Sequence, residues 1–177
     1  MKYIIASDIH GSAHFARLFA QRVEEENPDK VILLGDLLYH GARNALPGEY
    51  DTLKTAAILN GMKEKLLCVR GNCDSEVDAL VLEFPINADY CILPIGERTA
   101  IFTHGHKTPA VLQNGDVLFN GHYHVPAFEK LENYTYVNCG SVSIPKQNPP
   151  YSYLVLEDRN LLWKDVQTGE IFRREKL

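Results

Sequence analysis

Short apolar runs dominate the first half of the chain and alternate with stretches that have a helical pattern. Residues 3–7, 31–34 and 66–69 are almost continuously apolar, which is typical of strands buried on both faces. Ser12 can cap a helix whose apolar residues recur every three or four positions, and Asp51 can cap a second helix. The first half therefore predicts strands and helices in the order βαβαβ.

The second half is rich in short strand-like runs separated by turn residues. The expected strands are residues 90–95, 99–103, 117–120, 127–131, 134–138, 153–157 and 161–166. A short helix is expected before them, over residues 75–82. This order predicts an α/β fold of two packed, mixed β-sheets flanked by helices, in a single domain that spans residues 1–177.

The composition is that of an ordinary globular protein, with 45% hydrophobic and 23% charged residues in a chain of 177. A net charge of -5 without a cluster of Lys and Arg disfavours a long nucleic-acid partner. The apolar run at the N-terminus is too short for a signal peptide or a membrane span, so we expect no membrane association and a cytoplasmic location. The four cysteines lack Cys-x-x-Cys spacing and are expected to be reduced thiols.

Polar residues that commonly bind metal ions follow five of the predicted strands directly. They are Asp8 and His10, Asp36, Asn72, His104 and His106, and His122 and His124. In open α/β sheets, ligands bind in the crevice beyond the carboxyl ends of the strands, so five such ends can converge on one point. Each motif alone has an ordinary explanation as a turn, a helix cap or a surface pair. Their recurrence at five strand ends favours a metal site.

The spacing of these residues supports the same interpretation. Asp8 and His10 are two positions apart, so both side chains would lie on the same side of an extended chain, and His122 and His124 repeat this relation. A glycine precedes Asp36, as it precedes Asn72 and His122, and leaves room for a sharp turn of the backbone. Carboxylate, amide and imidazole ligands suit manganese, iron, nickel or zinc.

The order Asp-x-His, Gly-Asp, Gly-Asn, His, Gly-His-x-His resembles the calcineurin-like metallophosphoesterase superfamily. Longer segments, among them Arg70-Gly-Asn-Cys-Asp, Thr103-His-Gly-His and Gly140-Ser-Val-Ser-Ile-Pro-Lys, look like the bacterial YfcE-type phosphodiesterases. The resemblance spans nearly the whole chain. It implies the αββα metallophosphoesterase sandwich and the hydrolysis of small phosphodiesters by a hydroxide activated between two divalent metal ions.

The resemblance also implies a set of ligands. One metal ion would be held by Asp8, His10, Asp36 and His124, and the other by Asp36, Asn72, His104 and His122. Asp36 would bridge the two ions, and Asp36, Asn72 and His104 are the expected catalytic residues. By resemblance we favour manganese, with nickel, iron and zinc as alternatives.

Cys73 is the informative departure from the superfamily pattern, because many of its phosphatases have His immediately after the Asn. That His is thought to protonate the leaving group, and a thiol is a poorer general acid than an imidazole. We therefore expect a preference for phosphodiesters with good leaving groups, such as nitrophenyl esters. The alternative is that Cys73 is a small packed residue without a catalytic role.

Several further residues are candidates for contact with the substrate. The loop over residues 40–50 carries His40, Arg43 and Asn44, and it could close over the metal ions, with His40 as a substitute acid. An ordinary surface loop is the alternative. His106 is expected to orient a ligand or to touch the substrate.

Three other residues are expected to support the site rather than to act in it. Asp74 is expected to hydrogen-bond a metal-binding His from behind. His14 is expected to be structural, and Arg70 to be an ion-pair partner rather than a phosphate clamp.

Two other functions fit the same sequence. Vps29-type members of the superfamily are mainly assembly subunits, so the chain could be a scaffold without catalytic activity. A protein that binds or stores a single metal ion is the third hypothesis. The strand-rich second half also offers sheet edges through which copies of the chain could form a homo-oligomer.

Overall fold

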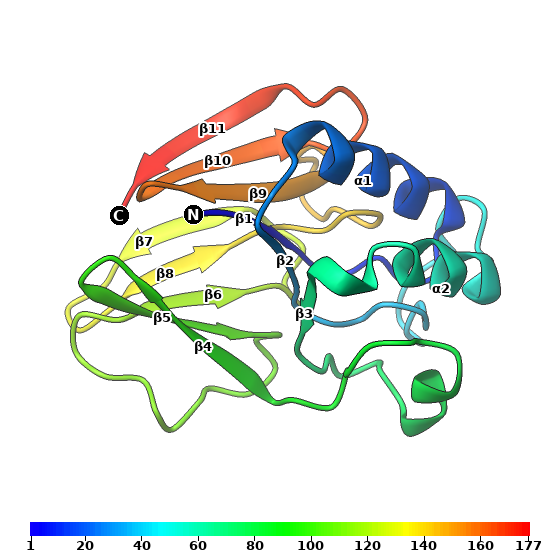
Figure 1. Cartoon of the computed structure of the whole chain (residues 1–177), viewed down its shortest axis with the longest axis horizontal. Coiled ribbons are helices and arrows are strands. Elements are labelled where there is room, and N and C mark those ends of the chain that lie inside the picture. The colour runs from blue at the N-terminus through cyan, green and yellow to red at the C-terminus, as the bar shows by residue number, and fades with distance from the viewer.

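The computed structural model describes residues 1–177 and contains two β-sheets (Figure 1). The first sheet comprises β1 (Lys2–Ala6), β2 (Lys30–Leu33), β3 (Leu66–Cys68), β9 (Ser152–Glu157), β10 (Asn160–Asp165) and β11 (Ile171–Lys176). The second sheet comprises β4 (Tyr90–Ile95), β5 (Arg98–Thr103), β6 (Val117–Asn120), β7 (Ala127–Lys130) and β8 (Thr135–Asn138). The strand order is β11-β10-β9-β1-β2-β3 in the first sheet and β4-β5-β6-β8-β7 in the second.

Both sheets are mixed in strand direction. In the first sheet, β1, β2 and β3 are parallel, whereas β9 is antiparallel to β1. In the second sheet, β5, β6 and β8 are parallel, and the outer strands β4 and β7 are antiparallel to their neighbours. The expected α/β sandwich of two packed, mixed sheets with helices is confirmed.

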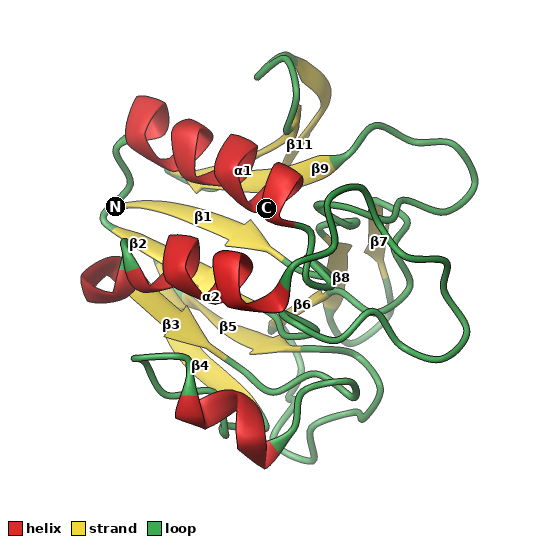
Figure 2. Ribbon diagram, turned by 90° about the vertical axis from the view of Figure 1, so that its right-hand side faces the viewer, coloured by secondary structure: helices red, strands yellow, loops and turns green.

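The two α-helices, α1 (Ala13–Glu26) and α2 (Thr52–Asn60), begin at the predicted caps. The Ser12 Oγ atom accepts a hydrogen bond from the backbone N–H of Phe15, and Asp51 accepts one from the N–H of Lys54. Both helices pack on the outer face of the first sheet (Figure 2), and no α-helix covers the second sheet. The short helix expected over residues 75–82 is a 3₁₀ helix, Glu76–Leu80, and another 3₁₀ helix covers Lys63–Lys65.

The apolar runs of β1 and β2 serve two separate cores because successive side chains point to opposite faces of a strand. Ile4 and Val31 pack against the helices, whereas Ile5 and Ile32 pack against the second sheet. These strands therefore have no polar face, which explains their nearly continuous apolar sequence.

The strand β11 is the element that the apolar pattern misses. It lies at the edge of the first sheet and pairs only with β10 (Figure 1). Its residues alternate between half-buried and exposed, and four of the six are charged. Pairing with β10, rather than burial of apolar side chains, makes this segment a strand.

The topology brings the functional loops to one edge of the molecule. The carboxyl ends of β1 and β2 lead into the side of the molecule where the long loops gather (Figure 2). Contacts between the loops after β1 and β6 show that the second sheet contributes to the same edge. None of the helices combines the length and the apolar character that crossing a membrane requires.

Candidate metal centre

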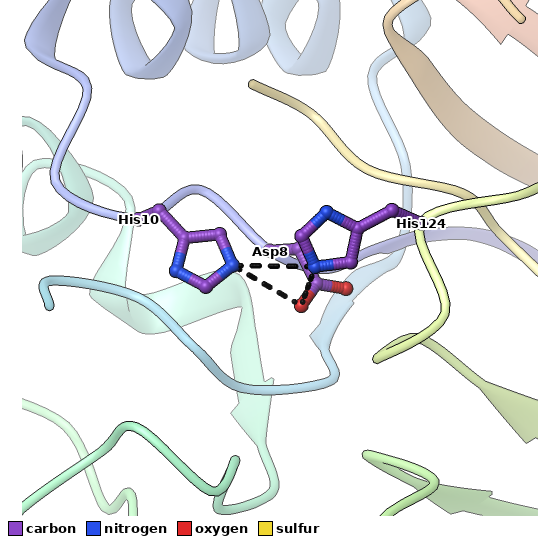
Figure 3. Close-up of side chains that lie close together, drawn as sticks. All are labelled: Asp8, His10 and His124. Atoms are coloured by element: carbon purple, nitrogen blue, oxygen red, sulfur yellow. Dashed lines mark hydrogen bonds and ion pairs between the residues drawn. The ribbon is translucent and has the colours of Figure 1, made fainter. Parts of the chain in front are cut away.

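The structure brings all seven predicted metal ligands together at the carboxyl ends of β1, β2, β3, β5 and β6. In the first cluster, the Nε2 atoms of His10 and His124 lie 3.5 and 3.1 Å from Asp8 Oδ1 (Figure 3). The two Nε2 atoms are 3.4 Å apart, and all three side chains are buried. These residues therefore present three ligand atoms to one small space.

The second cluster is centred on His104. Its Nε2 atom lies 3.4 Å from Asp36 Oδ2, 3.0 Å from Asn72 Oδ1 and 3.2 Å from His122 Nδ1. Asp36 also lies 3.8 Å from His10 Nε2, so its carboxylate stands between the two clusters. Ligand atoms of Asp8, Asp36 and His104 form a group within 4.8 Å of one another, which joins the clusters into one centre.

Backbone carbonyl groups orient three of the imidazole rings. The Nδ1 atoms of His10, His104 and His124 lie 2.8, 2.7 and 2.6 Å from the carbonyl oxygens of Tyr39, Leu34 and Ile144. A carbonyl oxygen can only accept, so each Nδ1 carries the hydrogen when the ring is neutral. The lone pair of each Nε2 atom then points into the centre, as metal binding requires.

Backbone N–H groups likewise hold the carboxylates of Asp8 and Asp36. One oxygen of Asp8 accepts a hydrogen bond from the N–H of His122 at 2.9 Å, and one oxygen of Asp36 accepts from the N–H of Cys73 at 2.8 Å. The other oxygen of Asp8 is buried and faces no donor while the rings of His10 and His124 are neutral. A buried carboxylate oxygen without a donor is costly unless a cation neutralises it, so these residues fit a bound divalent metal.

The backbone at these ligands differs from the extended conformation that their two-residue spacing suggested. Five ligands have a positive φ: Asp8 (60°), His10 (50°), Asp36 (55°), His122 (64°) and His124 (60°). Residues other than glycine rarely adopt this left-handed region, and such strain concentrates at functional sites. The side chains therefore converge because the loops turn sharply, and the expectation of an extended chain was wrong.

Close contact between the loops requires glycine at two positions beside the ligands. A Cβ atom at Gly71 would lie 2.1 Å from Asp36 Oδ1, and one at Gly121 would lie 1.9 Å from Ser7 Oγ. Both distances are far shorter than a van der Waals contact. The glycines before Asn72 and His122 thus allow neighbouring ligand loops to pack directly against each other.

Asp74 supports the centre in a different way from the one expected. Its buried carboxylate accepts hydrogen bonds from the backbone N–H groups of Asp36 and Leu37, both at 2.8 Å, and of Gly71 at 2.7 Å. The structure shows no contact to a metal-binding His, so that expectation was wrong. Asp74 ties the loop that carries Asp36 to the loop that carries Asn72.

The ionisable side chains of the centre strongly shift one another's pKa values. Burial lowers the pKa of His104, but the hydrogen bond to Asp36 and the charge of Asp8 outweigh it and raise this pKa to about 9. Burial likewise opposes ionisation of Asp8, yet His10 and His124 hold its pKa well below the ordinary value. Without a metal ion, a proton therefore supplies the positive charge that the carboxylates require.

Four of the seven candidate ligands line an open space of about 980 Å³, which we call the cleft: Asp36, Asn72, His122 and His124. Asp8, His10 and His104 are fully buried behind them. Among the predicted substrate-binding residues, Arg43, Asn44 and Cys73 line it. Burial and the neighbouring Asp36 raise the pKa of the Cys73 thiol to about 12, so this side chain stays protonated near neutral pH. The cleft is also lined by Tyr39, Arg70, Tyr123 and Lys146, of which only Arg70 was considered from the sequence.

The other two predicted substrate-binding residues lie outside the cleft lining. His40 packs edge-on against the rings of Tyr39 and Tyr50, and its carbonyl oxygen accepts from the Asn44 side chain at 2.8 Å. His106 is exposed and lies in a smaller recess of about 370 Å³ beside Asn72. Its ring centroid is 5.4 Å from that of His104.

Two supporting residues can also be placed. His14 is half-buried on α1 and lies 3.8 Å from a carboxylate oxygen of Glu49, outside the metal centre. Arg70 donates to the backbone carbonyl of Asp74 and forms no ion pair, so the expected ion-pair role was wrong. Its side chain lines both the cleft and the recess beside Asn72.

The family model for the calcineurin-like phosphoesterase superfamily domain matches residues 1–160, which include every ligand of the centre. The chain belongs to the calcineurin-like phosphoesterase superfamily. The resemblance drawn from the motifs is thereby confirmed.

Relatives within this superfamily agree with the assignment. Phosphodiesterase YfcE of Escherichia coli is 42% identical over 163 residues, which cover 89% of this chain and 88% of that protein. The structure of the E. coli YfcE phosphoesterase superimposes with a TM-score of 0.92 at 39% identity and covers 99% of both chains. Zinc-complexed Vps29 of Entamoeba histolytica, at 19% identity, TM-score 0.59 and coverage of 100% and 98%, shares the fold alone.

Replacing Asp74 by Asn tests its role in this superfamily member. The amide presents N–H groups to backbone N–H groups, so we expect a loss of about 2 kcal/mol in the free energy of unfolding. Because the Asp36 and Asn72 loops separate, metal affinity should fall by about tenfold or more. Urea unfolding and calorimetric titration with Mn²⁺ measure the two effects. Asp78→Asn is the control, because its amide oxygen can keep the single hydrogen bond that Asp78 accepts from the N–H of Ser75 in the neighbouring 3₁₀ helix. Equal metal affinity in both variants contradicts the assignment.

Metal binding should depend on pH because His104 must lose its proton to become a ligand. Its pKa is raised to about 9, so the proton is present below that pH and the metal ion must displace it. Apparent affinity for Mn²⁺ should therefore rise from about pH 6 to about pH 9, by up to about tenfold per pH unit for one displaced proton. Calorimetry in two buffers of different ionisation enthalpy counts the released protons. His14→Asn should keep the same slope, and binding that releases no proton near neutral pH excludes this model.

Proposed function

We propose that this chain is a metal-dependent phosphodiesterase that acts on small phosphodiesters. The observation that carries the proposal is the convergence of imidazole lone pairs and carboxylate oxygens beside a wide cleft, which four of these residues line. The 42% identity to the phosphodiesterase YfcE of E. coli supports the same reaction class. The likeness to Vps29, at 19% identity, is one of fold alone and does not favour the scaffold hypothesis.

The proposed ligands of two divalent ions are Asp8, His10, Asp36 and His124 for one ion, and Asp36, Asn72, His104 and His122 for the other. When bound, such ions lower the pKa of a water molecule and neutralise phosphoryl oxygens. We favour manganese, with nickel, iron and zinc as alternatives. The proposed donor set supports this choice, because carboxylate, amide and imidazole ligands do not demand zinc.

Positive side chains of the cleft would bind the phosphodiester. Arg43, Arg70 and Lys146 all line the cleft and offer N–H donors to phosphoryl oxygens. Asn44 is held by its hydrogen bond to the carbonyl of His40, which places its amide beside the same space. We assign His106 to the edge of the substrate site, because its recess shares Arg70 and Asn72 with the cleft.

The acidity of the Cys73 side chain decides which leaving groups the site can expel. It is a thiol that lines the cleft, and a thiol is a poorer general acid than the imidazole that many superfamily members have at this position. A substrate therefore has to carry a leaving group that departs without a proton. This favours phosphodiesters with acidic alcohols or phenols over simple alkyl monoesters.

We also propose that residues 1–177 form one metallophosphoesterase domain. The family model ends at residue 160, but β10 and β11 continue the first sheet by pairing with β9 and with each other. Trp163 of β10 is buried between the sheets, and its indole N–H donates to the carbonyl of Asn138. The final strands thus share the core of the matched segment.

Metal stripping followed by reconstitution tests the enzyme. Bis(4-nitrophenyl) phosphate should be hydrolysed only after Mn²⁺, Ni²⁺, Zn²⁺ or Mg²⁺ is added, with Mn²⁺ the most effective and about two ions bound per chain. Asp36→Asn should reduce the rate by about 100-fold or more, because it removes a charged ligand from between the clusters. Asp158→Asn, in the exposed turn after β9, is the matched control. Absence of metal-dependent hydrolysis promotes the scaffold, and one bound ion per chain promotes the single-metal hypothesis.

Restoring an acid at position 73 tests the leaving-group argument. In Cys73→His, an imidazole can protonate a poor leaving group, so the rate on alkyl monoesters relative to bis(4-nitrophenyl) phosphate should rise by about tenfold or more. Cys73→Ser removes the thiol without adding an acid and should leave this ratio unchanged. The explanation fails if the ratio in Cys73→His equals that of the unaltered protein.

A further inference from the structure

A second, mainly apolar pocket of about 450 Å³ adjoins the cleft, and we call it the side pocket. Its apolar walls are Leu38, Tyr39, Tyr50, Leu53, Val77 and Val81. It lies between the start of α2, the loop after β2 and the 3₁₀ helix Glu76–Leu80. Its volume falls within the range of pockets that bind small organic molecules.

The side pocket begins directly beside the metal centre. Tyr39, Cys73, Ser75 and Val77 line both the cleft and the side pocket, so the two spaces share a wall. The Cys73 Sγ atom lies within 4.8 Å of ligand atoms of His10 and Asp36. A group bonded to a phosphoryl oxygen at the metal centre can therefore reach the side pocket without leaving the protein surface.

This wall is anchored to the metal ligands through the backbone. The carbonyl of Tyr39 accepts from His10, and the N–H of Cys73 donates to Asp36. The wall is thus held in a fixed position relative to the metal centre. An occupant of the side pocket would orient the scissile bond as well as add affinity.

Apolar side chains at this place remain unusually accessible to water. Leu53 is 67% exposed, Val77 66% and Tyr39 43%. Exposed apolar side chains are ordinary when they are scattered, but here they surround one concave space next to a candidate active site. Burial of such surface by a ligand is favourable and supplies binding free energy.

The charged residues of the cleft and of the side pocket indicate which part of a substrate each space would bind. Asp78 is the only charged residue of the side pocket, and its carboxylate already accepts from the N–H of Ser75 at 2.9 Å. The cations Arg43, Arg70 and Lys146 all lie in the cleft, together with the carboxylates of Asp36, Asp74 and Glu76. With metal ions bound at the centre, the cleft would therefore favour an anionic group, and the side pocket a neutral group. The rings of Tyr39 and Tyr50 make a flat aromatic group the best match.

We propose that the side pocket binds a neutral aromatic ring carried by one ester arm of the phosphodiester, while the phosphoryl group lies at the metal centre. This inference rests on the proposed function and narrows its substrate class. A phenyl-type ring and a nucleobase share the required chemistry, and the experiment distinguishes them.

Two pairs of probes test the proposal by binding rather than by turnover. Phenylphosphonate and methylphosphonate differ only in the ring, as do adenosine 5′-monophosphate and ribose 5-phosphate in the base. Calorimetric titration of the Mn²⁺-loaded protein should show that the ring-bearing member of at least one pair binds about tenfold more tightly than its partner. The pair with the larger advantage identifies the kind of ring.

A charge placed in the side pocket should remove this advantage. Leu53 lies in the first turn of α2, where Leu53→Asp is compatible with the helix, and it lines the side pocket but not the cleft. We expect Leu53→Asp to reduce the ring advantage to about twofold or less while the ringless probes bind unchanged. Leu80→Asp is the control, because Leu80 is 83% exposed and lines neither space.

The outcomes separate this inference from the proposed function. Equal binding within both pairs, or an undiminished ring advantage in Leu53→Asp, overturns the side-pocket assignment even if phosphodiesters are hydrolysed. A ring advantage that only Leu53→Asp removes supports the assignment, whether or not the reconstituted protein turns over bis(4-nitrophenyl) phosphate.

Discussion

The rest of this structure depends on one constraint: the lone pairs of buried imidazole nitrogens and carboxylate oxygens face one another. Backbone carbonyls hold the Nδ1 hydrogens of His10, His104 and His124, so the Nε2 lone pairs point toward the carboxylates of Asp8 and Asp36. While these rings are neutral, nothing in the chain itself donates to the inner oxygen of Asp8. Such an arrangement is unfavourable without positive charge, and protons or divalent metal ions can supply it. The centre is therefore organised around cations.

The fold supplies the rigidity that this arrangement needs. Strands buried on both faces carry the ligand loops, and Asp74 ties two of these loops together through three backbone N–H groups. Glycine at positions 71 and 121 lets the loops approach each other, while the ligands themselves adopt left-handed backbone conformations. Packing and hydrogen bonding in the surrounding sheets offset the cost of this strained backbone.

The same construction divides the space above the metal centre. The wall formed by Tyr39 and Cys73 separates a cleft that contains cationic side chains from a mainly apolar side pocket. Both residues are fixed by backbone hydrogen bonds to candidate metal ligands, Tyr39 to His10 and Cys73 to Asp36. In the proposed function, chemistry and substrate selection would share the same loops, and Cys73 lines both spaces.

Much of this protein could be read from its sequence. The alternation of apolar runs and helical patterns determined the two-sheet sandwich, since burial on both faces leaves a direct mark on side-chain chemistry. The seven ligand candidates were visible because strand ends followed by Asp, Asn and His are chemically distinctive. The sequence did not reveal β11, whose few apolar residues make it a strand only through pairing with β10. Only the tertiary structure identified the carbonyls of Tyr39, Leu34 and Ile144 as partners of the imidazoles, because every residue has a carbonyl group and side-chain identity does not mark its use. It also decided the role of Asp74, the placement of His40 outside the cleft and the existence of the side pocket, because each depends on contacts between segments far apart in the chain.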